Sequence, residues 1–291
     1  MLSYSFRNHI LSVPVLKHFA RAFFERKGMR VFNRLCPDMQ VRFLDLGASG
    51  GLERASVFAP LRFLKNKRCV GVEPEKVEAD RLVRSGEYEK VYAEGVAGYT
   101  GDAVLHVLEP ESSSSIRELD LEFVESCCFQ HSCRKVTNKR IPIKVKTLDD
   151  IFGKDTQFDF IKMDIHGVEW DVLNSMSDGW FKNCVGFCIE CRQVPLFKGE
   201  HPSRDIEKLL SQKGYLVLKR IVGRDNYPDS LEEDLVFVKG VRTIDSVDLA
   251  LKHCLLGIMI GEYSYFRYIL RFWKERFGYS GVLADLERNL W

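Results

Sequence analysis

A glycine-rich turn directly after a short apolar run constrains this chain more than any other feature. The run Val41–Leu46 predicts a buried strand, and Gly47-Ala48-Ser49-Gly50-Gly51 follows it before an expected helix. Glycine permits a tight turn and a close approach of the backbone to a ligand, because no Cβ intervenes. In open parallel sheets, ligands bind beyond the carboxyl ends of the strands. The sequence therefore predicts a ligand site at this turn, with an ordinary strand–helix turn as the structural alternative.

Further strands and helices alternate along the chain after this turn. Apolar runs predict strands over 69–72, 91–97, 103–108, 141–145, 158–165, 185–191, 215–222 and 235–238, and helical periodicity covers 168–176 and 203–213. Strands separated by helices are typical of parallel βαβ units with helices on both faces of the sheet. A loop, not a helix, joins the last two strands, which indicates an antiparallel hairpin. We expect an α/β fold with a Rossmann-like, mostly parallel sheet and an antiparallel edge strand.

Both ends of the chain have helical periodicity. We expect an N-terminal helical segment over 1–40, a ligand-binding domain over 41–240 and a C-terminal helical extension over 241–291. The C-terminal part is rich in aromatic residues, which favour buried contact surfaces. Its structural interpretation is a helical subdomain packed on the core. The functional alternatives are a homodimer interface and part of a substrate lid.

Charge and cysteine content narrow the class of partner. The net charge is +2, so no strong field favours nucleic acid or an anionic membrane, and we expect neither as a partner. Several of the nine cysteines lie in apolar segments, where a free thiol behaves as a small hydrophobic group. Basic residues interrupt Met1–Phe24, and the apolar run Cys254–Gly261 is too short to span a bilayer. We therefore expect a cytoplasmic protein without a membrane span.

Acidic residues select the ligand class at the glycine turn. Glu73 follows the second predicted strand, where a carboxylate accepts hydrogen bonds from the ribose hydroxyls of a nucleoside. The turn lacks the Gly-x-Gly-x-x-Gly spacing of a pyrophosphate site, and Asp45 precedes it. A carboxylate repels a diphosphate but attracts a ligand that carries an ammonium and a sulfonium group. S-adenosyl-L-methionine is such a ligand. The expected cofactor-binding residues are Asp45, Gly47, Ala48, Ser49, Gly50, Glu73 and Pro74, with Glu94, Gly95 and Val96 beside the adenine.

Four segments carry a resemblance to a known family. They are Phe43–Gly51, Gly71-Val72-Glu73-Pro74, Thr147-Leu148-Asp149-Asp150 and Phe160–Glu169, which reads Phe-Ile-Lys-Met-Asp-Ile-His-Gly-Val-Glu. Their order and spacing, from about Val41 to Lys239, resemble the FkbM-type methyltransferases. The resemblance implies a class I methyltransferase sheet, S-adenosyl-L-methionine as the cofactor, and commonly transfer of a methyl group to an oxygen of a sugar or secondary metabolite. It does not identify the acceptor.

Two positions depart from the pattern of that family. Many members have Glu where this chain has His166, and the familiar Gly-Ala-Asn-x-Gly turn has Ser49 in place of Asn. Serine keeps a hydroxyl for the cofactor, so we expect binding to persist. The change at His166 leaves the detailed chemistry open.

Three residues are candidates for the chemistry of transfer. Asp164 ends the strand over 158–165, His166 lies at the following turn, and Glu190 ends the strand over 185–191. An alcohol acceptor benefits from a base that takes its proton, and the ordinary pKa of histidine suits this role at neutral pH. The structural alternatives are that Asp164 caps the next helix and that His166 only orients the turn. Glu169 suits the first turn of a helix, and we interpret Lys162 as structural or paired with an acid.

Metal binding and two other functions are the remaining alternatives. Zinc could be bound by the thiol and imidazole groups of Cys127, Cys128, His131 and Cys133, but these residues lack paired Cys-x-x-Cys spacing. In a second group of cysteines, strand alternation places Cys191 on the opposite face from Cys184 and Cys188. We expect no metal. The sequence predicts an O-methyltransferase for a small-molecule or glycan acceptor. A nucleotide-dependent oxidoreductase and a non-catalytic binding module acting through its helical tail remain the alternatives.

Overall fold

A computed structural model describes residues 14–126, 135–154, 156–222, 232–278 and 281–290. These residues form two compact units. One unit comprises residues 42–56 and 68–240, and the other comprises the N-terminal residues up to Val41, residues 57–67 and the residues from Val241 onward. The residues Cys127, Cys128, His131 and Cys133, considered above as zinc ligands, lie outside the described part of the chain.

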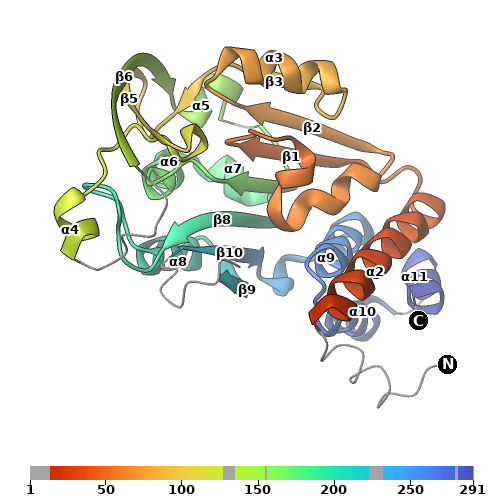
Figure 1. The fold of residues 1–291 in the computed structure, drawn as a ribbon. Helices are drawn as coiled ribbons and strands as arrows, with labels where there is room; N and C mark the ends of the chain where they lie inside the picture. The colour runs from red at the N-terminus through yellow and green to blue at the C-terminus, as the bar shows by residue number, and fades with distance from the viewer. Residues whose placement is uncertain (1–13, 127–134, 155, 223–231, 279–280, 291) are drawn as a thin grey trace. The chain divides into compact units, whose positions relative to one another are not determined.

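The main sheet has seven strands in the order β3-β2-β1-β7-β8-β10-β9 (Figure 1). These strands are β1 (Val41–Leu46), β2 (Lys67–Val72), β3 (Lys90–Tyr92), β7 (Phe160–Met163), β8 (Gly186–Arg192), β9 (Tyr215–Val222) and β10 (Glu232–Lys239). The β1–β7, β7–β8 and β2–β3 pairs are parallel, whereas β10 is antiparallel to both β8 and β9. The predicted mostly parallel α/β sheet and its terminal antiparallel hairpin are thus confirmed. The antiparallel strand is the inner member of that hairpin, because β10 inserts between β8 and β9.

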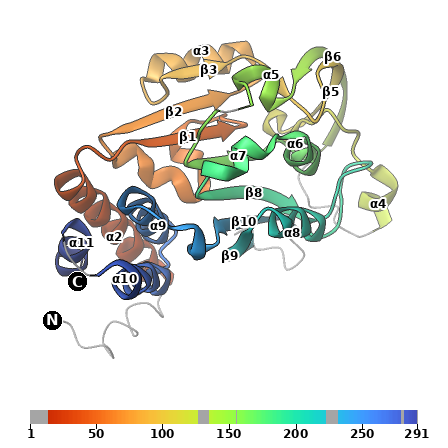
Figure 2. The same ribbon diagram turned by 180° about the vertical axis from the view of Figure 1, so that it is seen from behind.

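Helices follow the strands as expected for an α/β unit. They are α3 (Lys76–Ser85), α4 (Leu121–Ser126), α5 (Leu148–Phe152), α6 (Glu169–Ser175), α7 (Asp178–Asn183) and α8 (Ser203–Gln212). Figure 2 shows α6, α7 and α8 on the face of the sheet turned toward the viewer. The core between them and the sheet contains Ile161, Met163, Phe187 and Trp180, all almost fully buried. This core fixes the carboxyl ends of β7 and β8 in place.

Two sequence-based expectations need correction. The strand predicted over 91–97 is divided: β3 ends at Tyr92, and β4 (Gly95–Val96) joins a second, three-stranded sheet with β5 (Gly101–Glu109) and β6 (Lys135–Lys146). The helix expected after the glycine turn is formed by 3₁₀ segments, η1 (Leu52–Arg54) and η2 (Ser56–Phe63). Pro60 lies inside η2 and lacks the N–H that an α-helix would need there.

The second unit is helical. It contains α2 (Pro14–Leu35), α9 (Val247–Met259), α10 (Tyr263–Phe277) and α11 (Val282–Leu290), and a short η4 (Val241–Thr243) precedes α9. Helix α9 is buried over most of its length, and its His253 bonds through Nδ1 to the Tyr265 hydroxyl at 2.7 Å. Among the described residues, no helix has the length and apolar character needed to cross a membrane.

Candidate functional site

The glycine turn after β1 has a backbone that only glycine adopts comfortably. Gly47 has φ +75°, and a Cβ placed on it would lie 2.0 Å from the carbonyl oxygen of Asp164. The N–H groups of Gly47 and Ala48 donate to the carbonyl of Val72 at 3.0 and 3.3 Å. The turn is therefore held against the carboxyl ends of β2 and β7 at once.

Glu73 lies beside this turn, directly after β2. Its side chain is buried, and Oε1 accepts a hydrogen bond from the backbone N–H of Glu75 at 3.0 Å. Burial raises the pKa of Glu73 to about 7. Pro74 and Ser49 are exposed, and the N–H of Gly50 donates to Glu78 at 2.9 Å.

The other three candidate cofactor residues belong to the second sheet or its approach. Glu94 forms an ion pair with Lys146 at 2.8 Å, while Gly95 and Val96 pair with the end of β6. A Cβ on Gly95 would lie 2.9 Å from a side-chain carbon of Val145. Among the described residues, no hydrogen bond or ion pair connects Glu94 with the glycine turn.

A buried lysine connects the glycine turn with Asp164. Lys162 lies opposite Asp45 in the β1–β7 register. Its Nζ is 3.4 Å from Asp45 Oδ1, 3.3 Å from Asp164 Oδ2 and 3.2 Å from the Gly47 carbonyl oxygen. The other oxygen of Asp45 accepts a hydrogen bond from the buried hydroxyl of Tyr88 at 2.7 Å.

The structure brings Asp164, His166 and Glu190 close together. Nδ1 of His166 lies 3.4 Å from Glu190 Oε1, and Nε2 lies 3.8 Å from Asp164 Oδ1. His166 has φ +53°, and Ser115 donates its hydroxyl proton to the His166 carbonyl. Because Nε2 is 2.7 Å from the Ser112 carbonyl oxygen, which can only accept, Nε2 carries the proton of a neutral ring. The serine-rich segment therefore fixes both the turn and the orientation of the imidazole.

Sequence reasoning missed the fully buried Arg192 beneath this cluster. Its guanidinium bonds Glu190 at 3.0 Å and Glu200 at 2.9 Å, and also pairs with Glu232. In the sequence, the only indication that Arg192 lies beside Glu190 is strand alternation, which places residues 190 and 192 on the same face of β8. Glu232 lies on β10, opposite Arg192, and only the sheet order reveals this.

These neighbours set the charge of the cluster. Burial would raise the pKa of Asp164, but Lys162 and His166 hold it below its usual value. The pKa of Glu190 is raised to about 8 by burial and by the nearby carboxylate of Asp164. Burial would lower the pKa of His166, but Glu190 and Asp164 raise it above its usual value. Asp164 thus stays ionised at neutral pH, and a proton can reside on the Glu190–His166 pair.

Two further features surround the cluster. Donor atoms of Asp164, His166 and Glu190 lie within 4.8 Å of one another, but Lys162 and Arg192 already pair with two of these groups, so we assign no metal ion to them. Glu169 accepts hydrogen bonds from the backbone N–H groups of Ile165 and Gly167 at 3.0 and 2.8 Å. It therefore closes the turn between β7 and α6.

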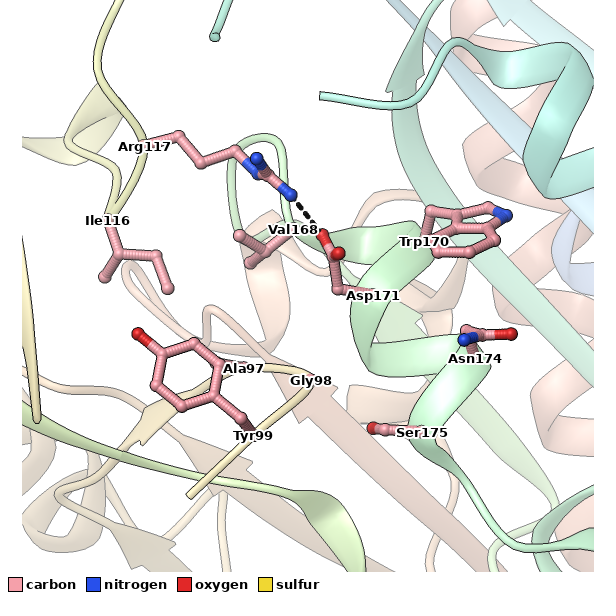
Figure 3. Close-up of a pocket in the computed structure, with 10 residues that line it drawn as sticks. All are labelled: Ala97, Gly98, Tyr99, Ile116, Arg117, Val168, Trp170, Asp171, Asn174 and Ser175. Carbon is pink, nitrogen blue, oxygen red and sulfur yellow. Dashed lines mark hydrogen bonds and ion pairs between the residues drawn. The ribbon is translucent and has the colours of Figure 1, made fainter. Parts of the chain in front are cut away.

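A cavity of about 470 Å³ lies between α6, the residues after β4 and the segment that follows Ser115 (Figure 3). Figure 3 shows the Arg117 guanidinium directed at Asp171 across the cavity, where they form an ion pair of 2.6 Å. The remaining lining residues are Ala97, Gly98, Tyr99, Ile116, Val168, Trp170, Asn174 and Ser175.

Comparisons with known proteins identify the domain. The model of the Methyltransferase FkbM domain family matches residues 48–217. No curated protein matches the chain. Among solved structures, the chain is similar to magnesium protoporphyrin IX methyltransferase from Synechocystis PCC 6803 with bound SAM. The sequences are 8% identical, the TM-score is 0.35, and the match covers 78% of this chain and 85% of that chain. The N-methyltransferase NodS from Bradyrhizobium japonicum WM9 has 10% identity and a TM-score of 0.35, with 74% and 96% covered.

Proposed function

The chain belongs to the FkbM methyltransferase family, and we propose that it transfers a methyl group from S-adenosyl-L-methionine to a hydroxyl oxygen of a small polar acceptor, such as a sugar or a glycosylated metabolite. The observation that carries this proposal is the arrangement around Lys162. The buried ammonium of Lys162 contacts Asp45 and the Gly47 carbonyl at the glycine turn, and also Asp164 directly after β7.

The residues at the turn fit the cofactor in shape and charge. Gly47 allows the backbone to turn tightly without a Cβ, and Glu73 lies buried at the end of β2. Oδ1 of Asp45 is buried and forms no hydrogen bond with the described residues, only the longer ion pair to Lys162. Three carboxyl groups, those of Asp45, Glu73 and Asp164, surround the one ammonium of Lys162, which favours a ligand with ammonium and sulfonium groups over a diphosphate.

When bound, the cofactor supplies an electrophilic methyl group to an acceptor oxygen. We assign the contacts of its amino-acid part to Asp45, Gly47, Ala48, Ser49 and Gly50, those of its ribose to Glu73 and Pro74, and those near its adenine to Glu94, Gly95 and Val96. Asp45 is fixed by Tyr88 and Lys162, and Glu73 keeps its carboxylate toward the turn.

Asp164, His166 and Glu190 face the acceptor in this proposal. Oδ1 of Asp164 is buried and has no hydrogen-bond donor among the described residues, while the side chain as a whole is 29% exposed, and we assign to this carboxylate the hydrogen bond of an acceptor hydroxyl. As the oxygen loses its proton, the Glu190–His166 pair takes it up, because the pKa of Glu190 lies near 8. Arg192 and the Ser112 carbonyl hold the two members of this pair in place.

A labelled-methyl screen tests the proposal. Purified protein is incubated with S-adenosyl-L-methionine that carries a radioactive methyl group and with a panel of monosaccharides, aryl glycosides and amines. NMR of the product then locates the methyl group. The proposal predicts an O-methylated sugar or glycoside, no product with Asp164→Asn, and unchanged turnover with the exposed control Glu89→Gln. Exclusive methylation of amines would contradict the oxygen assignment and leave the methyltransferase family assignment intact.

A further inference from the structure

Lys162 has a position that links the two halves of the candidate site, and we propose that it is a positioning residue for methyl transfer. Its ammonium holds Asp45, the Gly47 carbonyl and Asp164 in one arrangement, so that the cofactor turn and the acceptor carboxylate keep a fixed geometry. The inference rests on the proposed function, because it assigns Lys162 a role between the cofactor and the acceptor.

The ammonium lies against three oxygen atoms, one through a hydrogen bond and two through ion pairs. An ammonium has three N–H donors and no acceptor. The acceptors of Lys162 come from two strands: Asp45 and Gly47 from β1 and its turn, and Asp164 from the end of β7, all within 3.2 to 3.4 Å of Nζ. The side chain is only 6% exposed. Water therefore cannot take the place of any one of these partners without a change in the site.

A purely structural role would not require a lysine here. The flanking residues of β7, Ile161 and Met163, are fully buried and apolar. Removing an ammonium from water costs several kcal/mol, and well-packed apolar residues often replace buried ion pairs without loss of stability. A charge at this position is thus explained better by the two carboxylates that it orients than by the stability of the sheet.

The ammonium also controls the ionisation of its partners. Burial would lower the pKa of Lys162, but Asp164 and Asp45 raise it above its usual value, so it stays charged. Burial raises the pKa of Asp45, and Lys162 is the largest influence that lowers it. Besides Asp45 and Asp164, the titratable groups that face this pair from neighbouring elements are Glu73, Tyr88, His166, Glu190, Glu232 and Asp234.

The test measures binding of S-adenosylhomocysteine by calorimetry and its dependence on pH. Between about pH 6 and 8, wild-type affinity should change with the titration of Glu73, whose pKa is about 7, and this contribution is common to wild type and variant. Lys162→Met is expected to weaken binding by roughly tenfold, the loss of one charge-assisted interaction. Without the ammonium, the pKa values of Asp45 and Asp164 should rise, so the affinity of the variant should increase with pH more steeply than that of wild type. Lys144→Met, which removes an exposed lysine of β6 paired with Asp102, is the matched control and should behave as wild type.

A second variant keeps the proposal testable if Lys162→Met does not fold. In Lys162→Met/Asp164→Asn one uncompensated carboxylate is gone, so the double variant should fold even where Lys162→Met does not, and where both fold its melting temperature should exceed that of Lys162→Met. In the wild-type background, Asp164→Asn should lower the melting temperature because Lys162 loses a partner. This change of sign is the signature of direct coupling between the two residues.

The outcomes separate this inference from the proposed function. Failure of the wild-type protein to bind S-adenosylhomocysteine would remove the cofactor assignment itself. Binding by wild type, together with equal affinity and equal pH dependence in Lys162→Met, would leave that assignment standing and overturn the positioning role. Equal effects of Asp164→Asn in both backgrounds would overturn it as well.

Discussion

At the scale of single residues, the site depends on ionisable side chains that are held in unusual states by burial. Glu73, Asp164 and Glu190 are three carboxyl groups close to the ends of β2, β7 and β8, yet their surroundings differ. Lys162 keeps the pKa of Asp164 low, whereas the pKa values of Glu73 and Glu190 rise to about 7 and about 8. Carboxyl groups with such different pKa values can serve different roles, some in ligand binding and others in proton transfer.

Glu73→Gln is expected to stabilise the ligand-free protein and to weaken cofactor binding. The carboxyl of Glu73 titrates near 7 in the folded chain and near 4.5 when unfolded, so its contribution to stability is complete below 4.5 and is lost as pH rises through 7. At pH 8 the substitution should therefore raise the free energy of unfolding by up to about 3 kcal/mol, and at low pH it should change little. Melting curves at both pH values measure this.

The same variant should bind S-adenosylhomocysteine roughly tenfold or more weakly, because a charge-assisted hydrogen bond to the ribose is lost. Tighter binding by Glu73→Gln would remove Glu73 from the ribose site. Glu89→Gln, at an exposed ion pair with Arg68, serves as the control and should change neither quantity.

The pH dependence of turnover tests the role of Glu190. If the Glu190–His166 pair takes the proton, kcat/KM should rise with pH to a plateau, with an apparent pKa near 8. Glu190→Gln should abolish this rise and reduce turnover by roughly 10²-fold or more. A pH profile of Glu190→Gln that matches the wild-type profile would assign the titration to another group.

At the scale of elements, the turn between β1 and η1 positions the cofactor site. Gly47→Ala should lower the free energy of unfolding by about 2 kcal/mol or more, because its Cβ would meet the Asp164 carbonyl and φ is positive. Gly86→Ala is the matched control: φ is +73° but no atom lies within 4 Å of the added Cβ. It should cost only about 1 kcal/mol. Calorimetric unfolding separates the two effects, and equal losses would show that the clash with Asp164 is relieved by movement of the turn.

The elements also show what sequence patterns can and cannot predict. Strands β1, β7 and β8 are mostly buried, and the apolar residues that predominate in them made them predictable. The division between β3 and β4 was not predictable, because Ala93-Glu94 carries no glycine or proline to mark the change of sheet. Likewise, the Arg192 network depends on Glu232, which is distant in sequence and reaches Arg192 because β10 pairs with β8, and on Glu200 in the loop that follows β8.

At the scale of the whole molecule, most of the site follows from the order of strands in one sheet. The order brings β1, β7 and β8 side by side, so that Asp45, Lys162 and Glu190 belong to neighbouring strands. The sequence predicted Asp164, His166 and Glu190 as a group because each lies at the end of a parallel strand or just after it. The contacts that hold His166 come from Ser112 and Ser115, more than fifty residues earlier in the sequence, and Arg192 holds Glu190.

The most direct test of the account is calorimetric titration with S-adenosylhomocysteine, with NAD as the control ligand. S-adenosylhomocysteine alone should bind with micromolar or tighter affinity, and Asp45→Ala should weaken this binding by at least roughly tenfold, since the acid at the turn attracts the ammonium group. Asp102→Ala, at an exposed carboxylate of β5, should bind as wild type does. Folded wild-type protein that binds NAD, or that binds neither ligand, would contradict the assignment of this site to S-adenosyl-L-methionine.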